Sequence, residues 1–201
     1  MRLILLRHGE TLWNGESRLQ GHGNSPLSAK GIRQVTHIKK TIAQLSPARV
    51  ITSDLGRARQ TAELIGYPDA HPDKQLRELH MGEWTGLRKP DLIKNEPGRY
   101  WQWRAGEYTP AGGESWNTFC ERIHSALRNW VSQEDSDLLA VVHSGVIRAA
   151  CNVFINLPAE YLLPVTPGTV TILNFESPEQ KRPKLEAYNI GALVPDREAA
   201  D

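Results

Sequence analysis

The sequence predicts an α/β protein, a three-layer α/β/α sandwich with a mostly parallel central sheet. Short continuous apolar runs recur along the chain, as expected of buried parallel strands. Each run is followed by a polar cluster and then by a helix-like segment, which is the order of βα units. The length of 201 residues suits one well-packed domain, because typical domains have about 100 to 200 residues. We therefore expect a single domain over residues 1–201.

The parallel strands are expected at residues 2–6, 49–52 and 138–142. Further along, residues 169–175 alternate in part between apolar and polar side chains, and a polar turn that contains proline separates them from residues 184–188. This pattern predicts a hairpin near the C-terminus.

Two helices are predicted in the first half of the chain from their end signals. Ser28 is a good N-cap for a helix whose apolar residues recur at spacings of three and four, and Pro47 follows its end. A shorter helix is expected after Arg57 and should stop at Gly66.

Two more helices are predicted in the second half. The first begins at Ser115 and carries one apolar stripe, formed by Trp116, Phe119, Ile123, Leu127 and Trp130. The second begins near Ser144 and runs to about Ile155.

The segment at about 79–115 interrupts this regular order and is interpreted as a lid or insertion. Glycine and proline occur there together with the aromatic residues Trp84, Tyr100, Trp101 and Trp103. These rings could stack on a base or sugar of a ligand, or they could pack the lid onto the core. The tail after Pro195 is expected to be frayed.

The composition argues against several classes of partner. Lysine and arginine number 24 and aspartate and glutamate 23, so the net charge of +1 creates no general attraction to nucleic acid or to anionic membranes. The apolar run at residues 2–6 is too short for a signal peptide, and no stretch is apolar enough to span a bilayer. Cys120 and Cys151 form no Cys-x-x-Cys pair, which favours a reduced, cytoplasmic protein without disulfides or a metal cluster.

Residues that can bind a ligand or take part in catalysis follow the predicted parallel strands. In open α/β sheets, ligands bind outside the carboxyl ends of the strands. The segment Arg7-His8-Gly9-Glu10 follows the first strand, Ser53 to Arg57 follows the second, and His143-Ser144-Gly145 follows the third. Two histidines and two arginines from distant segments are thus expected at one crevice.

This set of residues indicates a site for a dianionic phosphate. Arginine forks and helix starts bind phosphate oxygens. A histidine among them, such as His8, can attack phosphorus through one ring nitrogen while a backbone carbonyl holds the other. No metal is then required. Taken singly, His8 and His143 could be structural and Arg57 a surface charge, but their joint placement favours function.

A proton donor for the leaving group is also needed. The residues offer three candidates, Glu10, Glu78 and Glu83, each of which could instead be a surface carboxylate.

Four motifs together resemble the histidine phosphatase superfamily, which includes the cofactor-dependent phosphoglycerate mutases. They are Leu6-Arg7-His8-Gly9-Glu10-Thr11 with Asn14, Ser53-Asp54-Leu55-Gly56-Arg57-Ala58 with Thr61-Ala62, Leu76-x-Glu78 with Gly82 and Gly86, and His143-x-Gly145. The resemblance implies a phosphoglycerate mutase-like fold that needs no cofactor.

The resemblance also implies roles for individual residues. His8 would be the phosphorylated nucleophile, with Arg7, Arg57 and His143 as phosphate-binding partners. Arg57 rather than Arg59 matches the family position. Asn14 and the backbone N–H of Ser144 would add phosphate contacts, although many members carry glycine where Ser144 stands. Among the three carboxylates, Glu78 matches the family acid.

Two differences from the mutases favour hydrolysis of a small phosphorylated metabolite. Leu79-His80-Met81 follows Glu78 where mutases have Arg-His-Tyr, and the segment between Glu78 and His143 is shorter than theirs. The Tyr100 to Trp103 region is similar to the lids of α-ribazole phosphatases and broad phosphomonoesterases. A bisphosphate-dependent phosphoglycerate mutase and a non-catalytic phospholigand-binding protein stay as alternatives, and the substrate and oligomeric state are left open.

Overall fold

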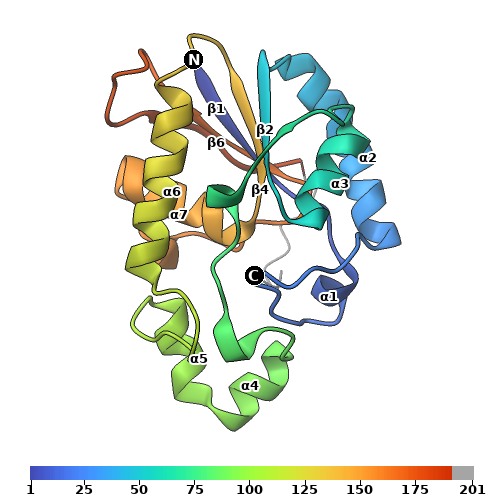
Figure 1. Ribbon diagram of the computed structural model, residues 1–201, viewed down its shortest axis with the longest axis vertical. Coiled ribbons are helices and arrows are strands. Elements are labelled where there is room, and N and C mark those ends of the chain that lie inside the picture. The colour runs from blue at the N-terminus through green and yellow to red at the C-terminus, as the bar shows by residue number, and fades with distance from the viewer. Residues whose placement is uncertain (192–201) are drawn as a thin grey trace.

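The computed structural model describes residues 1–191, which fold around one six-stranded sheet (Figure 1). Its strand order is β3-β2-β4-β1-β5-β6. The strands are β1 (Arg2–Arg7), β2 (Arg49–Ser53), β3 (His71–Asp73), β4 (Leu138–Val142), β5 (Val170–Asn174) and β6 (Lys184–Ile190).

The sheet is mostly parallel, as predicted. Strands β3, β2, β4 and β1 run parallel to one another, and the two predicted hairpin strands β5 and β6 are antiparallel. The three predicted parallel strands are direct neighbours in the order β2-β4-β1, so their carboxyl ends lie together. The predicted tail after Pro195 lies outside the described residues.

Helices cover both faces of the sheet, which confirms the three-layer sandwich. The helices are α1 (Leu12–Gly15), α2 (Ala29–Leu45), α3 (Gly56–Ile65), α4 (Lys89–Asn95), α5 (Pro97–Arg104), α6 (Trp116–Val131) and α7 (Ser144–Ile155), with 3₁₀ turns at Lys74–Leu76, Gly82–Trp84 and Ala159–Tyr161. In Figure 1, α2 and α3 lie on one side of the sheet and α6 and α7 on the other.

A hydrophobic core lies on each face of the sheet, and the side chains along β1 alternate between the two cores. Leu3 and Leu5 belong to the core shared with α6 and α7, whereas Ile4 and Leu6 belong to the core shared with α2 and α3. All four side chains are fully buried. The continuous apolar sequence of a central parallel strand therefore serves both faces.

The helix ends agree with the capping signals in the sequence. The side chains of Ser28 and Ser115 accept hydrogen bonds from backbone N–H groups in the first turns of α2 and α6. Helix α3 ends at Gly66, whose φ of 104° is readily adopted by glycine. At the start of α2, a Cβ on Gly31 would lie 2.0 Å from the carbonyl oxygen of Glu10. Glycine there lets the loop after β1 press against the helix.

The segment at 79–115 forms two short helices, α4 and α5, beyond the carboxyl ends of the parallel strands (Figure 1). Trp84, Tyr100 and Trp103 are buried, so packing rather than open stacking accounts for their rings. Trp101 differs, with 60% of its surface exposed. The use of this segment as a lid stays a prediction.

Helices in the described part of the chain are all too short or too polar to cross a membrane.

Candidate active site

Three distant segments bring buried polar residues to the carboxyl edge of the sheet. Arg7 and His8 come from the end of β1, His143 follows β4, and Arg57 lies in the first turn of α3. All four are buried. The rings of His8 and His143 meet edge to face, with centroids 5.2 Å apart. The structure thus brings together the two histidines and two arginines predicted to share a crevice.

Hydrogen bonds define the tautomer of His8. Its Nδ1 lies 2.7 Å from the carbonyl oxygen of Gly9, which can only accept, so Nδ1 carries the proton. Arg57 Nε donates to His8 Nε2 at 3.2 Å, so Nε2 holds a lone pair. Burial, then the charges of Arg57 and Arg7, hold the pKa of His8 well below its usual value. The ring is therefore neutral at neutral pH.

Arg57 is fixed by the loop before α2. Its Nη1 and Nη2 donate to the carbonyl oxygens of Gly23 and Gly21 at 2.7 and 2.8 Å. Burial lowers the pKa of Arg57 to about 10, and the group stays charged at neutral pH. Arg59 is exposed on the same helix, so the geometry favours Arg57 as the functional arginine. Arg7 donates to the carbonyl oxygen of Val165.

His143 and Asn14 present polar atoms suited to a ligand. Both ring nitrogens of His143 and the Nδ2 of Asn14 are buried and have no hydrogen-bond partner within residues 1–191. Burial, followed by the charge of Arg57, holds the pKa of His143 well below its usual value. Asn14 Oδ1 accepts from Thr11 N at 3.1 Å, which orients the amide. Ser144 is buried as the first residue of α7.

The three candidate acids differ in environment. Glu78 is buried, whereas Glu83 is exposed. Glu10 is held by Ser28 Oγ and by Lys30, each 2.8 Å from one of its carboxylate oxygens. Glu78 contacts the start of the helix that follows His143.

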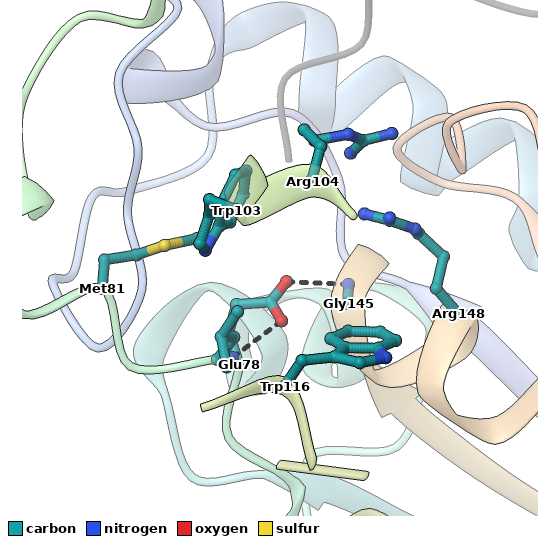
Figure 2. A pocket seen from close by; sticks show the side chains of 8 residues that line it. Glu78, Met81, Trp103, Arg104, Trp116, Gly145 and Arg148 are labelled. Carbon is teal, nitrogen blue, oxygen red and sulfur yellow. Dashed lines mark hydrogen bonds between the residues drawn. The ribbon is translucent and has the colours of Figure 1, made fainter. Parts of the chain in front are cut away.

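Two backbone N–H groups hold the Glu78 carboxylate (Figure 2). Leu79 N donates to Oε1 at 2.8 Å and Gly145 N donates to Oε2 at 3.0 Å. A Cβ on residue 145 would lie 2.2 Å from Oε1, so glycine is needed for this approach. The carboxylate thus sits at the positive end of α7.

His22 contributes a contact that the sequence interpretation missed. The sequence motifs give His22 no role, and its Nε2 lies 2.9 Å from the Glu78 carbonyl oxygen. It therefore helps to hold the backbone of Glu78. The only sequence signal was that glycines, Gly21 and Gly23, flank it; their contacts with Arg57 are seen in the structure.

A small cavity beside Glu78 contains two arginines that the sequence interpretation also missed. Arg104 comes from the end of α5 and Arg148 from α7 (Figure 2). An arginine inside the apolar helix α7 is unusual for a buried position, and this was a usable signal for Arg148.

The comparisons with known proteins agree with this architecture. The family model described as "Histidine phosphatase superfamily (branch 1)" matches residues 3–190. A "probable phosphoglycerate mutase" of Salmonella choleraesuis is 35% identical over 167 residues, which cover 79% of this chain and 77% of that protein.

Two solved structures are also similar over nearly the whole chain. The mycobacterial glucosyl-3-phosphoglycerate phosphatase, in a complex with VO3, has a TM-score of 0.85 and 30% identity, covering 94% of this chain and 98% of that one. The α-ribazole phosphatase of Shigella flexneri has a TM-score of 0.82 and 28% identity, covering 98% and 100%. The fold and these matches define a phosphoglycerate mutase-like α/β protein.

The chain belongs to the histidine phosphatase superfamily. Relatives named as phosphatases and as mutases both occur in it, and they support an enzymatic role in phosphate chemistry.

Proposed function

We propose that this protein is a metal-independent phosphatase that hydrolyses a small phosphomonoester through a phosphohistidine intermediate on His8. The proposal depends above all on the tautomer and the neutral charge of His8. Its Nδ1–H donates to the carbonyl oxygen of Gly9, its ring is neutral, and the lone pair of Nε2 faces the guanidinium group of Arg57. A neutral imidazole held in this way can act as a nucleophile, and the guanidinium group beside it can bind an anion.

In the first step, His8 Nε2 attacks phosphorus. A nitrogen–phosphorus bond forms as the bond from phosphorus to the leaving oxygen breaks. Arg7 and Arg57 offset the charge on the phosphoryl oxygens. Glu78 is the general acid of this step and donates a proton to the leaving oxygen.

Further donors hold the phosphoryl group during this step. One ring N–H of His143 and the amide of Asn14 are buried and suited to phosphate oxygens. The backbone N–H of Ser144, at the start of α7, adds the positive end of a helix.

In the second step, water attacks the phosphohistidine. An oxygen–phosphorus bond forms, the nitrogen–phosphorus bond breaks, and the proton of the water passes to Glu78. His8 returns to its neutral form and inorganic phosphate leaves. The two arginines provide the positive charge that a metal supplies in other phosphatases.

The proposal extends to the surroundings of the site. Residues 79–115 would act as a lid within a single domain, because Trp103 and Arg104 of α5 reach the cavity beside Glu78. A cytoplasmic location is proposed because Cys120 and Cys151 are both buried and unbridged within the described residues.

The first test is hydrolysis of an aryl phosphate in the presence of EDTA. We expect turnover in the wild type, its loss by at least about 1,000-fold in His8→Ala, and normal turnover in His37→Ala, which removes an exposed histidine of α2. Unchanged activity in His8→Ala, or loss of wild-type activity with EDTA, would contradict the proposal.

A phosphoglycerate mutase is the second candidate, favoured by the similarity to a protein with that name. The sequence Leu79-His80-Met81 after Glu78 argues for hydrolysis instead. Interconversion of the two monophosphoglycerates, primed with a bisphosphate, distinguishes them. Interconversion much faster than phosphate release would overturn the preference for a phosphatase.

A further inference from the structure

Arg7 is held by an irregular loop, residues 164–169, which leads into β5. The Arg7 guanidinium donates through Nη1 to the carbonyl oxygen of Val165, and the Arg7 backbone N donates to the carbonyl oxygen of Thr169 at 3.0 Å. In return, Gly168 N donates to the carbonyl oxygen of Arg7 at 3.1 Å. The 164–169 loop therefore fixes both the backbone of Arg7 and the direction of its guanidinium group.

The 164–169 loop has few groups of its own that could maintain its shape. Two of its six residues, Pro164 and Pro167, have no backbone N–H, and the loop contains no turn of helix and no strand. Buried irregular backbone must pair its polar groups with side chains or with neighbouring segments. The shape of this loop therefore depends on a partner outside it.

Asn189 of β6 is that partner. Its Oδ1 accepts from Thr166 N at 2.8 Å, and its Nδ2 donates to the carbonyl oxygen of Pro164 at 3.3 Å. These two hydrogen bonds flank Val165, whose carbonyl group holds the Arg7 guanidinium. Thr169 Oγ1 lies 2.8 Å from the same Oδ1. One buried amide thus connects the two ends of the loop.

The backbone at Asn189 explains how a residue of β6 reaches this loop. The pairing of β5 with β6 is irregular between Ile172–Ala187 and Val170–Ile190, where β6 advances three positions while β5 advances two. An extra residue of this kind forms a bulge, which changes the direction of a side chain. Asn189 has a φ of 58°, in the left-handed region that asparagine tolerates better than most residues.

We propose that Asn189 is a positioning residue, which holds the 164–169 loop so that Val165 directs the Arg7 guanidinium toward the phosphoryl group. The inference rests on the proposed function, because the phosphate must be bound at Arg7. A guanidinium group is a rigid planar fork, and it meets phosphate oxygens in pairs only when it is correctly oriented. Asn189 acts through Arg7, not by contact with the substrate.

Binding of inorganic phosphate, measured by calorimetry, tests this role without turnover. Asn189→Gly keeps the left-handed backbone accessible and removes the amide, so we expect the Kd for phosphate to rise about 10-fold. Asn156→Gly is the matched control, because Asn156 also has a positive φ, 55°, but is exposed at the end of α7. It should keep the wild-type Kd. Partial unfolding alone would lower the number of phosphate sites per molecule and leave the Kd unchanged.

Thr169→Ala is a milder change at the same amide and decides the question if Asn189→Gly does not fold. It removes the hydroxyl group beside Asn189 Oδ1, and we expect the Kd for phosphate to rise about 3-fold. An unchanged Kd in folded Asn189→Gly, or in Thr169→Ala when Asn189→Gly does not fold, would overturn the inference. Absence of phosphate binding to the wild type would also overturn it.

Steady-state kinetics with an aryl phosphate test whether Asn189 acts through Arg7. Asn189→Gly should raise KM about 10-fold in the wild-type background, and should change kcat/KM by less than about 2-fold in the Arg7→Gln background. Equal losses of kcat/KM in both backgrounds would overturn the role of Arg7 as the intermediary.

The two measurements separate this inference from the proposed function. If the wild type hydrolyses the aryl phosphate but its Kd for inorganic phosphate does not depend on Asn189, the positioning role is wrong and the phosphatase proposal stands. If the wild type has no turnover but its Kd for phosphate depends on Asn189, the positioning role stands and the phosphatase proposal fails.

Discussion

His8 and His143 are buried beside positive guanidinium groups, and this environment keeps both rings neutral. For His8, neutrality leaves a lone pair on Nε2 for the proposed attack on phosphorus. For His143, it leaves one ring nitrogen as a donor and the other as an acceptor. A bound phosphate dianion would reverse the surrounding charge and favour protonation of His143, which would strengthen its contact with the phosphoryl oxygens.

The buried histidines predict a pH dependence of stability. Their pKa values are lowered in the folded state, so below about pH 6.5 the unfolded chain binds more protons and stability falls as the pH falls. Between pH 7.5 and 5.5 a fully neutral His143 contributes a loss of about 1.4 kcal/mol. The free energy of unfolding should be measured by denaturant titration at pH 7.5 and at pH 5.5. The decrease between the two pH values should be smaller in His143→Gln than in the wild type, by about 1.4 kcal/mol. An identical change in both proteins would contradict this reading.

Gly145 permits the contact that holds Glu78, and this gives a second prediction. Gly145→Ala places a Cβ 2.2 Å from the Glu78 Oε1, so the carboxylate must move while the fold persists. We expect kcat to fall about 100-fold, since a displacement near 1 Å has such an effect. Gly98→Ala is the control, because a Cβ on Gly98 has no described atom within 4 Å. A variant with normal kcat would show that this position of Glu78 is not required.

Among the secondary-structure elements, α7 has the largest part in the site. It begins directly after His143, and its N-terminal N–H groups face Glu78 and the proposed phosphate position. The segment that carries Glu78 is held against the end of β2, because Arg77 donates two hydrogen bonds to Asp54 at 2.6 and 2.7 Å. The position of Glu78 therefore depends on a contact between residues that are 23 positions apart.

The N-cap of α6 allows a test of the packing away from the site. Ser115→Ala removes the side chain that accepts from Thr118 N at 3.2 Å. The free energy of unfolding should drop by about 1 kcal/mol, a typical value for loss of an N-cap. Thr36→Ala, at an exposed position inside α2, should change stability by less than about 0.5 kcal/mol. Equal effects of the two substitutions would mean that Ser115 does not act as a cap.

The arrangement of the entire chain explains why residues at positions 8, 57 and 143 meet. Strands β2, β4 and β1 are adjacent and parallel, so the segments that follow them emerge at one edge of the sheet. The helices on both faces then fix these segments in place. This convergence is the structural basis of the proposed function.

Much of this arrangement was predictable from local sequence patterns. The apolar runs predicted the central strands, and the caps at Ser28 and Ser115 and the stop at Gly66 predicted helix ends. The apolar run before His8 and the one before His143 sufficed to place both histidines at strand ends. These features depend on neighbours in sequence.

Other parts of the site depend on contacts between distant segments. Arg104 reaches the cavity only because the 79–115 segment folds back toward α7, and no periodic pattern in that segment predicts this packing. The bond from His22 to the Glu78 carbonyl joins residues 56 positions apart. Similarly, the residues alone could not distinguish Glu78 from Glu10 and Glu83. The contact between the Gly145 N–H and the Glu78 carboxylate distinguishes it, and this contact is visible only in the structure.

The most direct test of the account is capture of the phosphoenzyme. The protein is mixed with an excess of aryl phosphate, quenched with alkali because phosphohistidine is labile in acid, digested and analysed by mass spectrometry. The account predicts a phosphoryl group on His8, found in Glu78→Gln in larger amount than in the wild type and absent from His8→Ala. Phosphate release without any phosphohistidine, or a phosphoryl group on a residue other than His8, would contradict it.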